Sequence, residues 1–266
     1  MPLLYLISCR MFEDELVHIF EEDKNARLIL VDNENTEGIE KKLTEVAVKY
    51  EKTGIFDLPS VIGSGDVTDQ FTVVLNLLEF ALDAEPALLK DKVYRSIEEN
   101  GELFDGILVF YGLCGNVLGS LEKDFDHLGI PVRILKDAHG EIVDDCICAA
   151  FESRNAYVEA VMGEKRGEGT YFLTPMQAAN WREMLVLAKL TPDPDDTEMM
   201  KMVFDYSGYK CVGKVDTGLC YEKEFDNIVD DFASLFDFEK IIFKGSTKTT
   251  DKSYRSIKEE IIEYPK

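Results

Sequence analysis

Short apolar runs alternate along this chain with segments of helical spacing, and this alternation constrains the fold more than any other feature. Several of the runs are continuously apolar, which is typical of strands covered on both faces. The runs of strand length are residues 3–8, 27–31, 106–110, 132–135, 170–173, 212–215 and 241–243. The segments with helical spacing are residues 39–50, 71–82, 88–97, 155–161, 175–187 and 225–236. We therefore predict an α/β fold, mainly a parallel sheet with helices on both faces in Rossmann-like layers.

The length of 266 residues suits a single α/β domain. A chain of this size buries roughly 75% of its unfolded surface, so its core needs neither a disulfide nor a metal. The strongest internal break is Thr-Pro-Asp-Pro-Asp-Asp at residues 191–196, so two lobes with a boundary there are the alternative. No apolar run approaches the roughly 20 residues that span a bilayer, and the start lacks a signal-peptide pattern. We expect a cytoplasmic protein without membrane contact.

The charge is strongly negative, with 52 acidic against 29 basic residues and a net charge of −23. Such a field repels nucleic acid, and no basic patch offsets it, so we expect no nucleic-acid partner. The acidity is spread over the chain and does not form a tail. It indicates either a solvated, self-repelling surface or a surface that docks onto a basic partner.

Cysteines point to a candidate site. They stand at positions 9, 114, 146, 148, 211 and 220, a scatter that favours reduced thiols over a disulfide framework. In open parallel sheets, ligands bind beyond the carboxyl ends of the strands. Cys9 follows the first predicted strand, Cys114 follows residues 106–110, and Cys146 lies in the segment after residues 132–135. We predict that these three thiols meet at one edge of the sheet.

Converging thiolates suit a zinc ion or an iron–sulfur cluster, because both prefer soft sulfur donors. Three cysteines leave a fourth coordination position, which a substrate, His139 or Asp145 could occupy. Two other interpretations remain open: thiol chemistry without metal, and simple packing, since free cysteine is often buried. Cys148 and Cys211 are expected to pack in the core.

Two glycine-containing segments are further candidates for cofactor binding. Gly112 and Gly115 flank Cys114 and either let backbone amides approach a ligand or only permit a tight turn. The segment Asp216-Thr217-Gly218 either orients a ligand or caps a helix. The sequence contains no Walker loop, no dinucleotide glycine fingerprint and no Gly-x-Ser-x-Gly elbow, which disfavours nucleotide-dependent and hydrolase functions.

These segments also resemble a known family. The run from Tyr111 to Asn116, the Asp145-Cys146-Ile147 segment, residues 169–175 followed by Asn180-Trp181, and Asp216-Thr217-Gly218 are together similar to the domain-of-unknown-function family 1638. The resemblance spans about residues 80–250. This chain departs from the family at Arg10-Met11, where Gly-Ala usually follows the cysteine, and in the extra residues between His139 and Asp145. It is therefore expected to be a divergent member.

The resemblance carries implications for function. The family occurs in methanogenic archaea and anaerobic bacteria, and its genes often lie near corrinoid-dependent methyltransferases. It therefore implies a role in anaerobic one-carbon metabolism, with a corrinoid protein or a methyltransferase as partner and contact with a corrinoid. The family carries no established activity.

Three hypotheses about function follow. The first is a protein that binds a metal or an iron–sulfur cluster through Cys9, Cys114 and Cys146 and serves corrinoid-dependent methyl transfer. The second is a metal-free acidic docking or chaperone module for a methyltransferase or corrinoid protein. The third is a small-molecule enzyme that uses the same cleft without metal.

Overall fold

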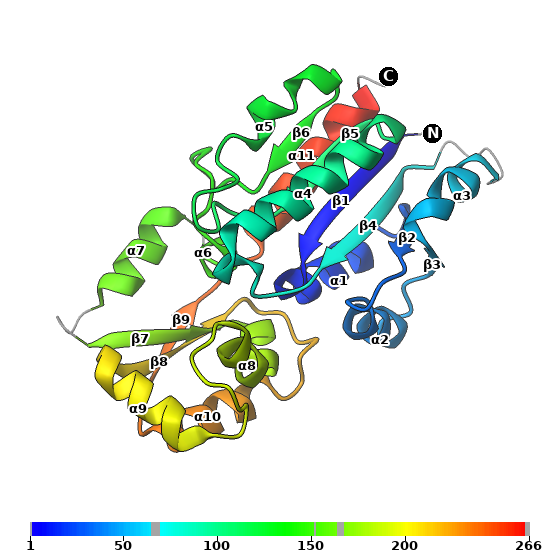
Figure 1. Cartoon of the computed structure of the whole chain (residues 1–266). Coiled ribbons are helices and arrows are strands. Elements are labelled where there is room, and N and C mark those ends of the chain that lie inside the picture. Colours follow the sequence, from blue (N-terminus) through cyan, green and yellow to red (C-terminus); the bar gives the residue numbers. More distant parts are fainter. Residues whose placement is uncertain (1, 65–69, 152, 164–167, 264–266) are drawn as a thin grey trace.

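Two parallel sheets organise the chain in the computed structural model, which describes residues 2–64, 70–151, 153–163 and 168–263 (Figure 1). The larger sheet has six strands in the order β3-β2-β4-β1-β5-β6, and the smaller has three in the order β7-β8-β9. All of these pairings are parallel. The six strands are β1 (Leu3–Cys9), β2 (Arg27–Val31), β3 (Tyr50–Thr53), β4 (Thr72–Leu78), β5 (Gly106–Phe110) and β6 (Val132–Ile134).

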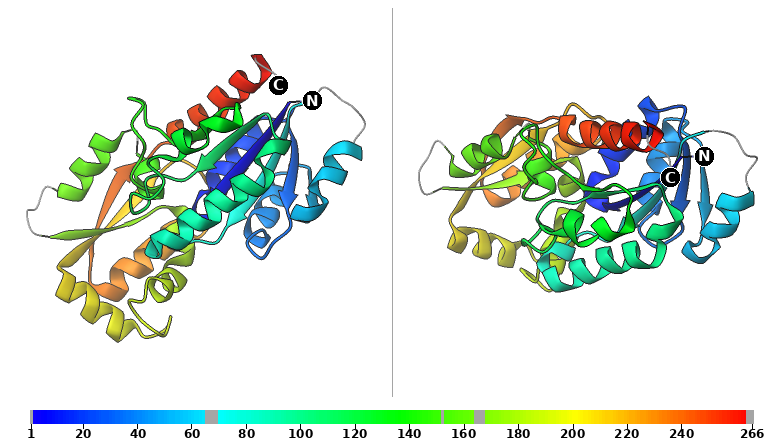
Figure 2. Two further views of the ribbon diagram at one scale, coloured as in Figure 1. Left: turned by 45° about the horizontal axis from the view of Figure 1, so that its top comes forward. Right: turned by 90° about the horizontal axis from the view of Figure 1, so that it is seen from above.

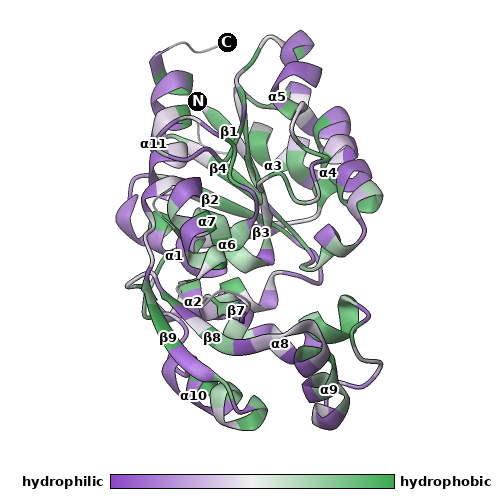
Figure 3. Ribbon diagram, turned by 90° about the vertical axis from the view of Figure 1, so that its left-hand side faces the viewer, coloured by the Kyte–Doolittle hydropathy of each residue, from purple (hydrophilic) through white to green (hydrophobic). Residues whose placement is uncertain are grey.

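The larger sheet is covered on both faces, as its continuously apolar strands require. Every residue of β1 is buried between β4 and β5. Helix α4 (Pro86–Asn100) lies on one face, while α1 (Glu13–Glu22) and α11 (Lys248–Glu263) lie together on the other (Figure 2). The strands are hydrophobic and the helices turn hydrophilic residues outward (Figure 3). The predicted α/β fold with a parallel sheet is confirmed.

One predicted helix is wrong. Residues 71–82 carry apolar residues at helical spacing, but most of this segment is β4, the strand between β1 and β2. The segment Thr72–Leu78 is apolar at nearly every position and rich in branched side chains, and this suits a central strand buried on both faces. Similarly, residues 39–50 divide into α2 (Glu37–Glu45) and the start of the edge strand β3.

The smaller sheet has its own aromatic core. Its strands are β7 (Gly169–Leu173), β8 (Tyr209–Asp216) and β9 (Glu239–Lys244). Helices α8 (Pro175–Leu187), α9 (Thr197–Ser207) and α10 (Phe225–Phe236) pack on one face around Trp181, Phe204 and Phe232. Phe151 and Phe172 belong to a separate cluster on the other face, beside α7 (Arg154–Met162).

The chain passes between the two sheets twice. It leaves the larger sheet through α6 (Cys146–Ala149) and α7, and it returns after β9, so that α11 packs against β1, β5 and β6. Residues 191–196, the alternative boundary between two lobes, join α8 to α9 within the layer on the smaller sheet. The short helices α3 (Leu58–Ser64) and α5 (Leu121–Asp124) complete the larger unit. Of the helices described, none has both the length and the apolar character needed to cross a membrane.

The aromatic core should dominate the stability of the smaller unit. The ring of Phe204 lies 5.0 Å from that of Phe236 and 5.4 Å from that of Phe238, and only 3% of Phe204 is exposed. We expect Phe204→Ala to lower the free energy of unfolding by about 3–5 kcal/mol. Urea unfolding followed by the fluorescence of Trp181, which packs on Phe232 and Phe236, measures the loss.

The matched control is Tyr206→Ala on the same helix. Tyr206 is 94% exposed, so its loss should change the free energy of unfolding by no more than about 0.5 kcal/mol. Equal losses in the two variants would contradict the assignment of this core.

Candidate functional site

The candidate site lies where the carboxyl ends of β1 and β5 point toward the smaller sheet (Figure 1). Cys9 is the last residue of β1, and its Sγ accepts a hydrogen bond from the backbone N–H of Met11 at 3.5 Å. The 3-10 turn Arg10–Phe12 follows, and the start of α8 packs against it. The thiol of Cys9 is therefore buried at the junction of the two sheets.

The loop after β5 is attached to the chain that leads to Cys146. The backbone N–H of Leu113 donates to the Val143 carbonyl at 2.8 Å, and that of Cys114 donates to the Asp144 carbonyl at 2.9 Å. Gly112 makes this approach feasible, because a Cβ atom there would lie 2.4 Å from the Val143 oxygen. This attachment brings Cys114 and Cys146 to the same place.

Left-handed backbone shapes the end of the same loop. Cys114 has a φ of 42° and Gly115 a φ of 78°. A Cβ atom on Gly115 would lie 2.9 Å from Cγ of Pro86, at the start of α4. Both glycines thus permit close contacts within the chain. Cys114 adopts a backbone conformation that residues other than glycine rarely take.

Cys146 begins α6 and is contacted by α8, a helix of the smaller unit. The Gln177 side chain donates from Nε2 to Sγ of Cys146 at 3.0 Å. Its Oε1 accepts from the backbone N–H of Thr174 at 3.1 Å, as part of the capping box that starts α8. Gln177 is 2% exposed, so one buried amide joins the cap of α8 to the thiol.

The three thiols share one electrostatic neighbourhood. Burial raises the pKa of Cys9 to about 12 and also raises the pKa values of Cys114 and Cys146. The Cys9 thiol contributes to the increase at Cys114, and both of these thiols contribute to the increase at Cys146. The exposed carboxylate of Asp83, in the turn after β4, acts in the same direction on all three. In the metal-free chain these thiols are therefore protonated at neutral pH.

Tyr111 adds a polar group to the same neighbourhood. It directly follows β5 and is 3% exposed. Its hydroxyl lies within hydrogen-bonding reach of the Cys9 thiol but makes no hydrogen bond of good geometry with any residue that the structure describes. Burial, followed by the charges of Cys9 and Cys114, raises its pKa well above the ordinary value.

The groups near the thiols do not form a closed set of ligands. Asp145 caps α6, because its carboxylate accepts from the backbone N–H of Cys148 at 2.7 Å and from the Tyr157 hydroxyl at 3.1 Å. Burial raises its pKa, although both hydrogen bonds act to lower it. In the described ranges, no three His, Cys, Asp or Glu side chains are grouped so that they could hold a metal ion as they stand.

The remaining predicted residues lie elsewhere. His139 is exposed on a turn, where its backbone N–H donates to Asp137, and it is not among the main groups that shift the thiol pKa values. In the Asp216-Thr217-Gly218 segment at the end of β8, the Asp216 carboxylate accepts from the backbone N–H of Gly218 at 3.0 Å. Gly218 lines a pocket of about 600 Å³ with His18 and other residues of α1 and α2.

A buried charge cluster adjoins the site at the start of α1. Lys42 of α2 lies 2.7 Å from Asp14, 3.7 Å from Glu13 and 3.6 Å from Glu222 of the smaller unit. Burial acts to lower the pKa of Lys42, but Asp14 and Glu13 outweigh it and the pKa is raised. This ammonium group therefore joins the two units with its charge retained.

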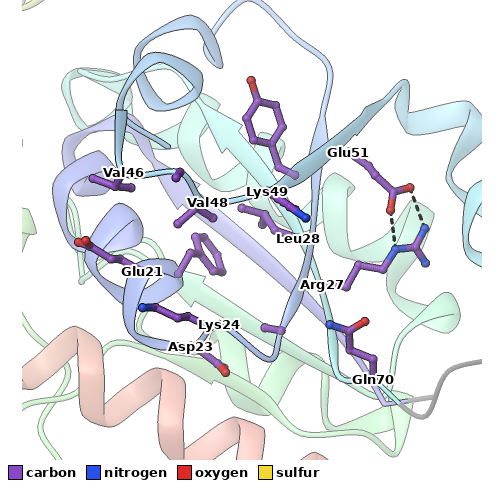
Figure 4. A pocket seen from close by; sticks show the side chains of 14 residues that line it. Glu21, Asp23, Lys24, Arg27, Leu28, Val46, Val48, Lys49, Glu51 and Gln70 are labelled. Carbon is purple, nitrogen blue, oxygen red and sulfur yellow. Dashed lines mark hydrogen bonds and ion pairs between the residues drawn. The ribbon is translucent and has the colours of Figure 1, made fainter. Parts of the chain in front are cut away.

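A larger pocket, of about 960 Å³, lies at the other end of the sheet (Figure 4). It surrounds the starts of β2 and β3, where Arg27 pairs with Glu51 through two hydrogen bonds of 2.8 Å. Ligands of parallel sheets bind at the carboxyl ends of the strands, and the cysteines lie at that end. We therefore place the candidate site at the thiols and not at this pocket.

A family model described as a protein of unknown function, DUF1638, matches residues 77–254. The chain belongs to this family. The membership predicted from the loop sequences is thus confirmed, and the DUF1638 match includes Cys114 and Cys146 but begins after Cys9.

Other comparisons carry no argument about the DUF1638 site. A comparison with curated proteins gives no match. Among solved structures, the signal recognition particle receptor FtsY from Elizabethkingia anophelis in complex with GDP shares 14% identity, over 50% of this chain and 57% of that chain. The TM-score is 0.24, which is too low to indicate a common fold.

Two residues of the site, Tyr111 and Gln177, were not among those predicted from the sequence. Tyr111 stands directly after a buried strand, which is a position that ligands often approach. Gln177 stands three residues after Thr174, the spacing of a capping box. That spacing was available in the sequence, but the contact between Gln177 and Cys146 was not.

Stability should depend on pH through Glu15. Burial and the charge of Asp14 raise its pKa to about 8, while Lys42 opposes the shift and Asp251 of α11 adds to it. Between about pH 4.5 and pH 8 the unfolded chain releases this proton while the folded chain keeps it, so stability falls as the pH rises. Glu15→Gln removes the effect. We expect its advantage over the wild type to grow by at least about 1.4 kcal/mol from pH 5 to pH 8.

Urea unfolding at several pH values measures this difference, with Glu98→Gln, an exposed position of α4, as the matched control. Parallel pH profiles for the wild type and Glu15→Gln would contradict the prediction.

Proposed function

We propose that this protein binds a zinc ion or an iron–sulfur cluster through the thiolates of Cys9, Cys114 and Cys146. The observation that carries the proposal is that the fold brings these three cysteines, two buried and one half-buried, to one edge of the larger sheet from distant parts of the chain. Burial alone disfavours the charged thiolate form. A bound cation stabilises that form, because a thiol that coordinates a metal is deprotonated outright. Without a cation the thiols make only local contacts: Cys9 and Cys114 pack in the apolar core, and Cys146 accepts a hydrogen bond from Gln177.

Binding requires the three sulfurs to lie closer together than they do in the described ranges of this structure. Rotating a side chain away from its preferred rotamer costs about 0.5–1.5 kcal/mol. Zinc binding to a structural cysteine site contributes about 10–16 kcal/mol. The energy of coordination therefore exceeds the cost of moving three thiols, and the arrangement suits a site that closes around its ion.

The biological role in this proposal is anaerobic, corrinoid-dependent methyl transfer. Its only support is the expectation that genes of this family lie near corrinoid-dependent methyltransferases, since the family itself is of unknown function. A corrinoid protein or a methyltransferase is accordingly the partner to test first. The metal centre would supply either electron transfer or Lewis-acid activation.

A metal-free docking module is the second candidate. It is favoured by apolar side chains on the outer face of α9, where Met202 is 72% and Tyr206 94% exposed. Neighbouring exposed acids, Glu198 and Asp205 among them, suit a partner with a basic surface.

Anaerobic purification followed by metal and sulfide analysis tests the proposal. We expect bound zinc, or iron with labile sulfide and a brown colour, at a fixed ratio to protein. Cys114→Ala should remove most of the metal, because it deletes one of three ligands. Cys211→Ala, which deletes a buried thiol of β8, should leave the metal content unchanged.

Colourless, metal-free wild-type protein that also fails to take up zinc or iron when these are supplied would overturn the proposal and favour the docking module. Equal metal content in Cys114→Ala and the wild type would overturn the ligand assignment.

A further inference from the structure

We propose that the outer face of α9 is a docking surface for an amphipathic helix of a partner protein, whose apolar face is flanked by lysine or arginine. The docking surface consists of the apolar stripe Met199, Met202 and Tyr206 together with the acidic residues beside it. The inference deepens the docking candidate named under the proposed function, on which it rests, and it needs no metal at the thiols.

The first argument is the apolar character of both sides of α9. On the inner side, Met200 and Phe204 are buried and belong to the aromatic core of the smaller unit. On the outer side, Met199, Met202 and Tyr206 are 41%, 72% and 94% exposed. They follow one another at intervals of three and four residues, so they form one stripe along the helix. A helix that only covered the smaller sheet would be polar along this side.

The second argument is that the stripe is accessible and has the composition of an interface. Helix α9 lies on the outside of the smaller unit, away from the larger sheet (Figure 1). Methionine and tyrosine are enriched at protein interfaces. A flexible methionine side chain adapts its shape to a partner, and a tyrosine ring offers a large apolar surface with a polar tip.

The third argument is the charge beside the stripe. Glu198 lies on the outer side of α9, and Asp193 and Asp195 stand just before the helix. All three are exposed, and none forms an ion pair within the part of the chain that the structure describes. Lys201 of α9 instead donates to the Phe236 carbonyl of α10 at 3.0 Å, so its charge is turned away from the stripe. Lysine or arginine on a partner complements this surface.

The fourth argument is the shape of the stripe, which fits a helix. Residues 199–206 rise about 10 Å along the axis of α9, or two helical turns. Apolar side chains at this spacing form a ridge that packs against the apolar face of a second helix. A second copy of this chain fits less well, because each copy carries a net charge of −23 and the acidic residues beside one stripe would repel those beside the other.

Binding of two synthetic peptides, followed by fluorescence anisotropy, tests the inference on the full chain. The first is an 18-residue peptide of leucine, lysine and alanine, with leucine at helical spacing on one face and lysine on both flanks. The second has the same composition in scrambled order, so it has the same charge but no apolar face. We expect the wild type to bind the first peptide at least about ten-fold more tightly than the second, because only the first can cover the stripe.

Met202→Ala and Tyr206→Ala should each weaken binding of the first peptide about ten-fold, since truncation of a central interface residue has an effect of this size. Phe56→Ala is the matched control. Phe56 is also 94% exposed, but it lies in the 3-10 turn Ile55–Asp57 of the larger unit. This variant should bind both peptides as the wild type does.

Four results would overturn the inference. They are failure of the wild type to bind the first peptide, equal affinity for both peptides, equal affinity of the wild type and the two α9 variants, and loss of folding in these variants. A dimer of the wild type in sedimentation, abolished by Tyr206→Ala, would assign the stripe to a second copy and overturn it as well.

Failure of the inference is distinguishable from failure of the metal proposal. Tyr206→Ala should contain as much metal as the wild type, because its exposed side chain lies far from the buried thiols in the fold. A wild type that binds metal but not the first peptide overturns the docking surface alone. A wild type that binds the first peptide through α9 but takes up no metal overturns the metal proposal alone.

Discussion

The candidate site depends on two main-chain hydrogen bonds between the loop after β5 and the segment before α6. They join Leu113 to Val143 and Cys114 to Asp144, and they bring the loop that carries Cys114 against the segment that leads to Cys146. Both require Gly112, since any side chain there would collide with the Val143 carbonyl. Cys9 reaches the same point because β1 and β5 are adjacent parallel strands that end at the same edge of the sheet. The backbone therefore brings all three cysteines to one edge of the sheet, although in the described ranges their sulfurs are not grouped closely enough to hold a metal as they stand.

The smaller unit contributes to this site through α8, the helix that follows β7. Gln177 caps α8 and contacts Cys146, so the orientation of the smaller sheet is linked directly to one thiol. The rim of the junction also carries exposed ion pairs, such as Lys189 with Glu85 and Lys223 with Glu45. Such pairs contribute at most about 1 kcal/mol each. The buried contacts of Lys42 and of the start of α8 therefore hold the junction more firmly than its rim does.

Much of the fold could be predicted from the sequence because its signals are local. Residues 175–187 and 225–236 are helices with the predicted bounds, and Thr174 and Pro175 mark the start of the first of these. The segment that forms β4 could not be predicted, because its apolar residues fit both helical spacing and a buried strand. The segment is a strand because it pairs with β1 and β2, and local periodicity gives no information about pairing between distant segments.

The candidate site was predictable only in part, for a similar reason. The rule that parallel strands end at one edge places Cys9 and Cys114 together. It gives no information about the turn that carries His139, which is exposed, or about the contact between Gln177 and Cys146. That contact arises from the packing of one sheet unit on the other, which depends on residues far apart in the chain.

X-ray absorption at the metal edge of metal-loaded protein tests the central claim most directly. With zinc, a coordination shell of three protein sulfur atoms at about 2.3 Å, together with one lighter atom, is the result expected here. A shell of oxygen and nitrogen atoms without sulfur would place the metal elsewhere and contradict the thiol site.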